Sequence, residues 1–151
     1  MVLTAEEIYV PLKRITGLRQ GQLLAINLTE HWDGTILHPP TSKGGKDTRY
    51  NGEALTRAIG GVLGNRIPRG WLFANRQGRR VSVTGFRSMW RRAMVRYTSK
   101  GGIRFNEHDI RKTVAMQAKT LDEAQRLLGH QESKTTARVY RIGSVEVEVL
   151  E

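Results

Sequence analysis

The sequence predicts a mostly α-helical domain with a small antiparallel β-sheet, an α+β fold. The chain has 151 residues, the size of one ordinary domain with a single core. Apolar residues recur at helical spacing in several segments, and most of these segments follow a helix-capping residue. Short apolar runs beside turn dipeptides supply the strands, and no internal repeat is present. Residues 1–151 are therefore expected to form one domain.

The first helix is predicted over residues 4–16. Thr4 and Glu7 form a capping-box pattern, and apolar residues follow at helical spacing. Pro11 lies inside this stretch and favours a kink or a later start, because proline has no backbone N–H to donate. Gly17 is expected to end the helix.

A second short helix and a β-hairpin are predicted next. Residues 20–26 contain apolar side chains at helical positions and predict a short helix. Residues 32–39 form a β-type segment with turn dipeptides near its start and at its end. Residues 42–47, which contain two adjacent glycines, are expected to form the tip of a hairpin.

The middle of the chain predicts one helix followed by loops. Asn51 is the expected cap. The loop at residues 64–70, the short apolar run at residues 71–73 and the turn at Gln77 and Gly78 come after this helix. The apolar side of the helix consists of Leu55, Ile59, Val62 and Leu63.

Three further helices are predicted. Thr84 opens a helix whose arginines lie mostly off the apolar stripe. Asn106 is the expected cap of a helix over residues 107–119, and Thr120 opens a capping box for a helix that stops at Gly129. The apolar stripe of the helix from Thr84 consists of Phe86, Met89, Trp90 and Met94.

The C-terminal part predicts a last helix and a strand-like tail. Residues 135–141 are expected to form a short helix. Residues 144–150 alternate valine with polar residues, a pattern that favours pairing with a sheet edge. That edge belongs either to the same subunit or to a neighbour, so a homo-oligomer formed through the tail is one expected arrangement.

Positive charge is the first indication of function. The chain has 25 Lys+Arg against 14 Asp+Glu, a formal net charge of +11, and this implies a polyanionic partner. A solvated charged face is the simpler alternative. An anionic membrane surface fits less well, because no strongly apolar interfacial helix accompanies the charges. We predict a double-stranded DNA partner, with phosphate contacts from Lys46, Arg87, Arg91 and Arg92.

Composition excludes several other classes of protein. The chain contains no cysteine, which rules out disulfides and thiolate metal sites. The first fifteen residues contain no long apolar run, so neither a signal peptide nor a membrane span is expected there. We therefore expect a cytoplasmic protein.

Each candidate site residue is weak when taken alone. His108 and Arg111 are three positions apart and share a helix face, but such pairs occur often by chance. His130 follows Leu-Leu-Gly, where a histidine commonly caps the preceding helix. An isolated Tyr140 would be a packing aromatic, and Lys43 at a loop tip would be solvated.

Taken together, the candidate motifs follow one another in a fixed order. They are Thr-Gly-Leu-Arg-Gln-Gly-Gln-Leu-Leu at residues 16–24, Lys43, His-Asp-Ile-Arg-Lys-Thr at residues 108–113, Leu-Leu-Gly-His at residues 127–130, Thr135-Thr136 and Tyr140. This ordered series resembles the signature of the tyrosine recombinases, the phage integrase family. The resemblance covers nearly the whole chain and implies the catalytic-domain fold of that family, with cleavage and rejoining of DNA through a covalent 3′-phosphotyrosyl link.

The chemistry of this reaction explains why two arginines are needed. Attack of a tyrosine oxygen on a phosphodiester builds negative charge on the non-bridging oxygens, and without a metal fixed cations must meet that charge. Arginine stays charged and offers bidentate hydrogen bonds to phosphate. Arg19 and Arg111 are therefore the expected clamps, and His130 is expected to be a further donor.

The remaining roles follow from the resemblance. Tyr140 is the implied nucleophile, and His108 is the implied base that removes its proton, since a phenol with a pKa of about 10 is rarely ionised at neutral pH. Lys43 is the implied acid that protonates the leaving 5′-oxygen, and Lys46 is the second candidate for that role. Gln22 stands where the family usually has an acid.

The predicted activity is site-specific DNA recombination that needs neither metal nor cofactor. Acidic residues are scattered, so no dense carboxylate cluster is present to hold two metal ions. The stretch before Thr16 is too short for the core-binding domain with which full recombinases clamp DNA, and we expect that domain to be absent from this chain. The alternatives are a non-catalytic DNA-binding module, an inactive integrase relic and an RNA-binding protein of ribosomal type.

Overall fold

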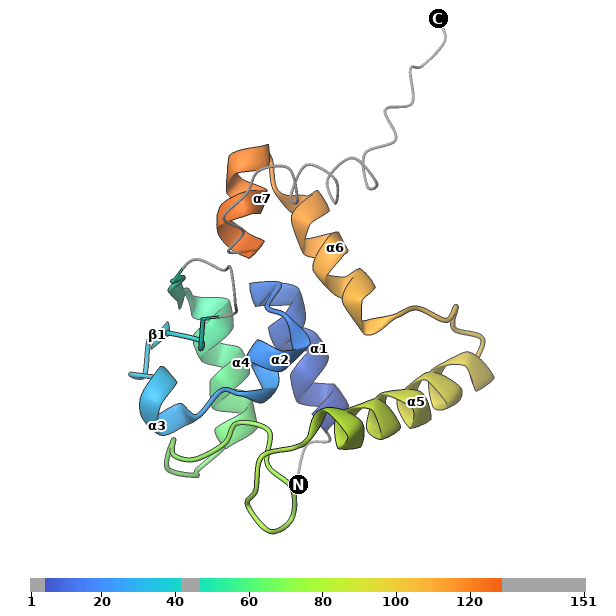
Figure 1. Cartoon of the computed structure of the whole chain (residues 1–151), viewed down its shortest axis with the longest axis horizontal. Helices are drawn as coiled ribbons and strands as arrows, with labels where there is room; N and C mark the ends of the chain where they lie inside the picture. Colours follow the sequence, from blue (N-terminus) through green and yellow to red (C-terminus); the bar gives the residue numbers. More distant parts are fainter. Residues whose placement is uncertain (1–4, 42–46, 129–151) are drawn as a thin grey trace, which may run out of the picture.

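The computed structural model describes residues 5–41 and 47–128, which form a helical body with one small sheet (Figure 1). The mostly helical α+β fold predicted from the sequence is confirmed. In chain order the elements are α1 (Ala5–Thr16), α2 (Gln20–Leu24), α3 (Leu28–His31), β1 (Ile36–Leu37), β2 (Tyr50–Asn51), α4 (Glu53–Leu63), α5 (Val83–Ser99), α6 (Glu107–Gln117) and α7 (Leu121–Leu128).

Helix α1 is the central element of the body. It packs against α4, α5 and α6, and Figure 1 shows α4 beside it with α6 and α7 at one end. The helix continues through Pro11, whose side chain is exposed. Gly17 ends it as predicted, with a φ of +66° and its N–H donating to the Lys13 carbonyl at 2.8 Å.

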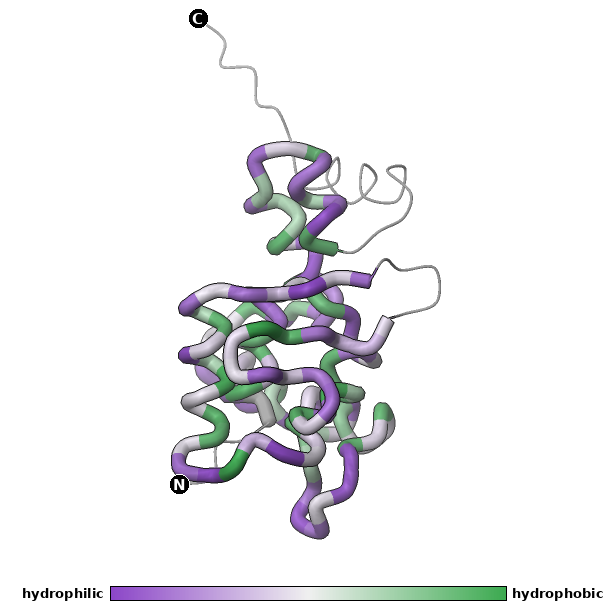
Figure 2. The backbone as a smooth tube through the Cα atoms, turned by 90° about the vertical axis from the view of Figure 1, so that its left-hand side faces the viewer, coloured by the Kyte–Doolittle hydropathy of each residue, from purple (hydrophilic) through white to green (hydrophobic). Residues whose placement is uncertain are grey.

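The main core forms where one face of α1 meets α4 and α5. The ring of Tyr9 contacts the rings of Phe73, Phe86 and Trp90, with centroids 4.4 to 6.4 Å apart. Phe86 and Met94 are buried on α5, which confirms the predicted apolar stripe of this helix. In Figure 2 hydrophobic and hydrophilic residues alternate along the helices, as expected of helices with one buried face. A second, smaller core joins α6 to α7 and contains Ala115, Ala118, Ala124 and Leu128.

The sheet consists of β1 and β2, paired antiparallel with Ile36 opposite Asn51 and Leu37 opposite Tyr50. The predicted small antiparallel sheet is confirmed, although β1 covers only part of residues 32–39. Asn51 was predicted as a helix cap, and this is wrong. Its backbone pairs in β2, and Gly52, with a φ of +131°, precedes α4 instead.

Helix α3 was not predicted from the sequence. Asn27 caps it by accepting a hydrogen bond from the Thr29 N–H at 3.0 Å, and the Asn27 N–H donates to His31 Nδ1 at 2.8 Å. The predicted hairpin tip, the helix at residues 135–141 and the strand-like tail lie wholly or largely outside the described residues. Among the residues described, no helix has the length and apolar character needed to span a membrane.

Candidate active site

Arg19 lies at the turn that joins α1 to α2. It directly precedes α2, and its backbone is extended (φ −66°, ψ 150°). The side chain of Gln22 accepts a hydrogen bond from the Arg19 N–H at 3.3 Å and donates to the Pro40 carbonyl at 3.0 Å. Gln22 therefore ties the Arg19 turn to the chain that follows β1, a role that needs an amide rather than a carboxylate.

Arg111 lies on α6 and is almost completely buried, with 3% of its surface exposed. Its Nη1 donates to the Gly17 carbonyl, and its Nη2 donates to the Leu128 carbonyl at 2.8 Å. Burial and the nearby charge of Arg19 lower the pKa of Arg111 to about 10. The side chain stays charged at neutral pH and links the end of α1 to the end of α7.

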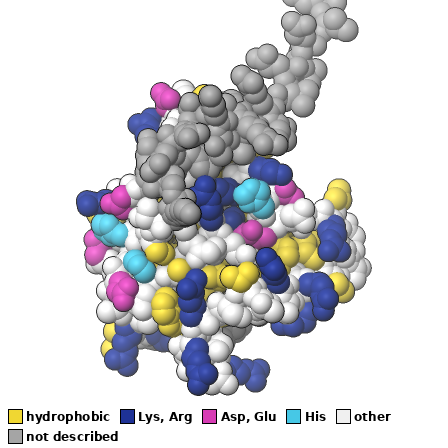
Figure 3. Space-filling view, viewed as in Figure 1, with side chains coloured by type: hydrophobic (Ala, Val, Ile, Leu, Met, Phe, Trp, Pro, Cys, Tyr) yellow, Lys and Arg dark blue, Asp and Glu magenta, His cyan; other side chains and the backbone are white. Residues whose placement is uncertain are grey.

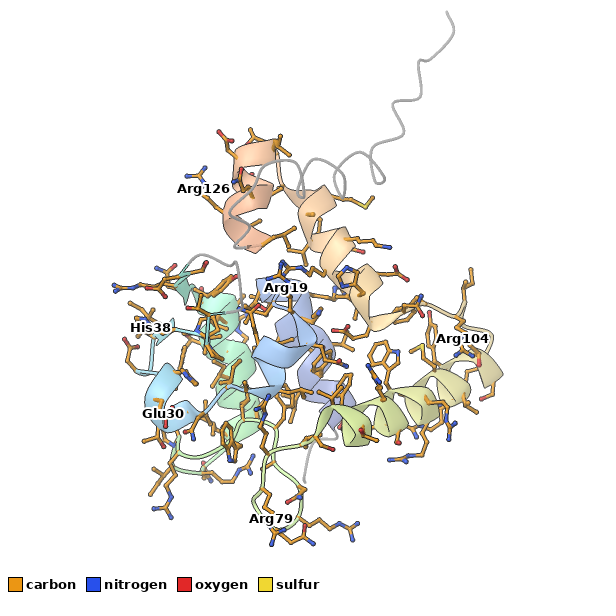
Figure 4. The ribbon with its side chains drawn as sticks, in the orientation of Figure 1. Arg19, Glu30, His38, Arg79, Arg104 and Arg126 are labelled. Carbon is orange, nitrogen blue, oxygen red and sulfur yellow. The ribbon has the colours of Figure 1, made fainter. Side chains whose placement is uncertain are left out.

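Arg19 and Arg111 lie near enough to each other to act on the same titratable groups. Arg19 lowers the pKa of Arg111, and both arginines lower the pKa of Lys13 beyond the larger effect of its burial. Burial raises the pKa of Tyr50 to about 12, and the same two arginines oppose that rise. Figure 4 shows Arg19 near the end of α1 that faces α6 and α7. The predicted pair is therefore brought together by folding, although the two residues are far apart in sequence.

His108 lies in the first turn of α6, one turn before Arg111. Partial burial lowers the pKa of His108, and the charges of Lys13, Arg111 and Lys112 lower it further, while Glu107 acts in the opposite direction. The imidazole is therefore neutral at neutral pH and able to accept a proton. Its position between these charges is compatible with the base role that the sequence predicts.

The last turn of α7 is held at the same place. The hydroxyl of Tyr50 donates to the Leu127 carbonyl at 2.8 Å, and Arg111 donates to the next carbonyl, that of Leu128. Carbonyls at the end of a helix have no partner within the helix, so these side chains supply the missing donors. The chain thus leaves α7 beside Arg111. His130, Tyr140, Lys43 and Lys46 lie outside the described residues.

Three residues of this region were missed by the sequence analysis. Lys13 and Tyr9 on α1 both contact the carboxylate of Glu107: Lys13 forms an ion pair with it, and the Tyr9 hydroxyl donates to it. Burial raises the pKa of Tyr9, so the phenol keeps its proton. The signal that could have found them is a lysine at a position of α1 where helical spacing from Tyr9 and Leu12 predicts an apolar side chain.

The basic face predicted from the sequence lies mainly on α5. The side chains of Arg87, Arg91 and Arg92 are exposed. Arg87 and Arg91 line a pocket of about 250 Å³ together with Arg104 and with Glu107 of α6. Figure 3 shows Lys and Arg side chains distributed over this face of the molecule, and Figure 4 shows Arg104 in the chain after α5. The arginines of α5 therefore adjoin the first turn of α6, where His108 lies.

Comparison with known proteins agrees with this geometry. Residues 4–144 match the family model described as "Phage integrase family". No curated protein shows significant similarity to the chain.

Among solved structures, the XerA recombinase superposes with a TM-score of 0.66 at 19% identity, covering 93% of this chain and 58% of the other. The Tn1549 transposon integrase in complex with transposon right end DNA gives a TM-score of 0.71 at 15% identity, covering 88% and 53%. A lambda integrase dimer bound to a COC′ core site gives 0.67 at 20% identity, covering 95% and 44%. The chain thus spans about half the length of these structures.

Proposed function

The chain belongs to the phage integrase family, and we propose that it cuts and rejoins DNA at specific sites through a covalent 3′-phosphotyrosyl link made by Tyr140. One observation carries this proposal: folding brings Arg111 to the turn that holds Arg19, because Arg111 donates to the carbonyl of Gly17, two positions before Arg19, and His108 lies one turn before Arg111 on α6. Among the described residues no group of three or more side chains could hold a metal ion, and a cluster of cations suits a phosphodiester that gains negative charge during the reaction.

The two arginines have different roles in this proposal. Arg19 is half-buried and reaches the region from a turn, so it supplies hydrogen bonds to the phosphate oxygens. Arg111 is held by two carbonyls, so its charge is fixed in place before DNA binds. A fixed charge costs no reorganisation when the transition state forms, which is why such preorganised groups contribute strongly to catalysis.

The covalent step transfers one proton at each side of the phosphorus. The Tyr140 oxygen forms a bond to phosphorus, and its proton passes to His108. The bond to the 5′-oxygen breaks, and that oxygen takes a proton from Lys43 or, as the second candidate, from Lys46. Resealing is the reverse of this step, with a 5′-hydroxyl as nucleophile, so no ATP, cofactor or metal ion is consumed.

Position in the chain supports the inclusion of His130 and Lys43. His130 follows Leu128 by two positions in the sequence, and the Leu128 carbonyl contacts Arg111. Lys43 follows Pro40 by three positions, and the Pro40 carbonyl contacts Gln22 beside Arg19. Both residues therefore belong to segments that begin at the proposed site.

Binding to double-stranded DNA rests on the charge of the chain. The formal net charge is +11, and the arginines of α5 are exposed beside the site. We propose that Arg87, Arg91, Arg92 and Lys46 contact phosphates, and that residues 1–151 act as one catalytic domain. Pairing between subunits through the tail at residues 144–150 stays a prediction.

The test is capture of the covalent intermediate. The protein is incubated with a library of nicked duplexes that have a randomised core. After cleavage, the piece of strand between the cleavage site and the nick dissociates, so the protein cannot reseal the break. We expect a protein–DNA adduct that survives denaturation, is absent with Tyr140→Phe, and forms equally well in EDTA.

The same assay decides between the proposal and its alternatives. The exposed arginines of α5 would serve a binding module equally well. If wild-type protein retains DNA on a native gel but gives no adduct with any duplex, the chain is a binding module or an inactive relic. A preference for RNA duplexes over DNA would favour the ribosomal-type alternative.

A further inference from the structure

Lys13 is the unusual residue of the core. Its side chain is completely buried on α1, where it forms an ion pair with Glu107 of α6. Its Nζ lies 5.9 Å from the centre of the Tyr9 ring, and the Tyr9 hydroxyl donates to the same carboxylate. Tyr9 and Lys13 are four positions apart on α1, so both reach Glu107 from one helix face.

Stability alone does not explain this ion pair. Removing a charged group from water costs several kcal/mol, and replacing a buried pair by apolar residues of similar volume is often neutral or stabilising. The ring of Tyr9, which lies beside the Lys13 Nζ, is fully buried, so part of the surroundings of position 13 is apolar. We therefore ask which parts of the molecule the ion pair connects.

The ion pair joins the two segments that carry the proposed site. The Lys13 carbonyl accepts a hydrogen bond from the Gly17 N–H at 2.8 Å, and the Gly17 carbonyl accepts one from Arg111. Glu107 is the first residue of α6 and lies next to His108. Lys13 is therefore connected to Arg19 through the end of α1 and the Gly17 turn. Through its ion pair with Glu107 it is also connected to the neighbouring His108.

We propose that the buried Lys13–Glu107 ion pair is a positioning element of the cleavage step, which holds the first turn of α6 against α1 so that His108 keeps a fixed place relative to Arg19. This inference rests on the proposed function. Neither Lys13 nor Glu107 touches the reacting atoms in this account, and both act through the residues that do.

The ion pair also sets the charge around His108. The charged groups that act on His108 are Lys13 of α1 and Glu107, Arg111 and Lys112 of α6. Lys13 lowers the pKa of His108 and Glu107 raises it. Loss of Lys13 should therefore raise the pKa of His108, and loss of Glu107 should lower it. An ion pair with only a remote structural role would not produce these opposite shifts.

The first test follows His108 by NMR titration in the DNA-free protein, with its resonance assigned through His108→Gln. Lys13→Met is expected to raise the pKa of His108 and Glu107→Gln to lower it. Arg14→Met removes an equal charge from the next, exposed position of α1 and serves as the matched control, with no comparable change expected. Unchanged titration of His108 in both partner variants would overturn the proposal.

The second test uses the double variant Lys13→Met/Glu107→Leu, which removes both charges and remains usable if a single variant fails to fold. We expect a melting temperature close to that of the wild type, because the Tyr9 hydroxyl loses its acceptor while two buried charges are removed, together with unchanged DNA affinity and adduct formation slower by about tenfold, a part of the 10²–10⁴-fold effect of a well-placed base. Adduct formation at the wild-type rate would overturn the positioning role.

The two tests separate this inference from the proposed function. If wild-type protein forms no adduct, the proposed function is contradicted, and the titration of His108 still decides whether the ion pair governs that residue. If wild-type protein forms adduct and the double variant forms it equally fast, only the positioning role is lost.

Discussion

Arg19 and Arg111 have different surroundings in the candidate site. Arg111 is 3% exposed and joins Gly17 to Leu128, whereas Arg19 is half-buried at a turn. Removing Arg111 would leave two buried carbonyls without these donors and a space in the core. Removing Arg19 leaves the packing of α6 and α7 in place. The two residues should therefore respond differently to the same substitution.

We predict that Arg111→Met lowers the free energy of unfolding by about 2–6 kcal/mol, because each of the two buried carbonyls left without its donor costs about 1–3 kcal/mol, and that Arg19→Met lowers it by less than about 1 kcal/mol. Urea unfolding followed by circular dichroism measures both. Equal losses for the two variants would contradict the structural role of Arg111 described above.

His108 provides a prediction about pH. Partial burial and the charges of Lys13, Arg111 and Lys112 hold its pKa below the ordinary histidine value of 6.5. The protonated imidazole is inactive as a base, so the rate of adduct formation is expected to rise with pH through this lowered pKa and to level off above it. Rates measured on a nicked duplex between pH 5 and pH 8 check this. The His108→Gln variant should lose this rise of the rate with pH, and the control variant His38→Gln should keep it. A rise centred above the ordinary histidine pKa would argue against His108 as the base.

At the scale of the elements, long periodic segments were predictable from the sequence and short segments were not. The apolar stripe of α5 extends over several turns, so its type and buried side could be inferred. Helix α3 has four residues, and the N–H of its first residue, Leu28, donates to the carbonyl of Gly70, a distant partner that no local pattern reveals. Asn51 has the chemistry of a cap, but pairing with Ile36 places it in a strand.

Substitutions on α5 should affect DNA binding without affecting the cleavage reaction. The exposed arginines of this helix contact DNA in the proposed function but do not take part in the reaction. We predict that Arg91→Ala reduces the slope of log K against log salt concentration by about 1 and weakens binding to all sequences alike, while sparing the rate at saturating DNA. Filter binding at several salt concentrations measures the slope, and Arg57→Ala on α4 is the control. A loss confined to one DNA sequence would indicate base recognition instead.

In the whole molecule, the candidate site forms where α6 packs against α1 and α7. The end of α1 presents Arg19, the start of α6 presents His108, and the end of α7 is bound by Arg111. The sequence motifs identified Arg19, His108 and Arg111 as candidates. They could not predict Lys13 and Tyr9, because their partner Glu107 is nearly a hundred positions away and only the packing of α1 against α6 brings them together.

In the proposed function, Arg19 and Arg111 neutralise negative charge on one phosphate. To test this, the scissile phosphate of a captured duplex is replaced by a methylphosphonate, which lacks that charge. Adduct formation on both substrates is then measured for the wild type and for Arg19→Ala. Arg19→Ala is expected to fail on the natural phosphate and to recover on the neutral linkage, because the charge it would have met is gone. Equal impairment on both substrates, with DNA binding intact, would contradict the claim.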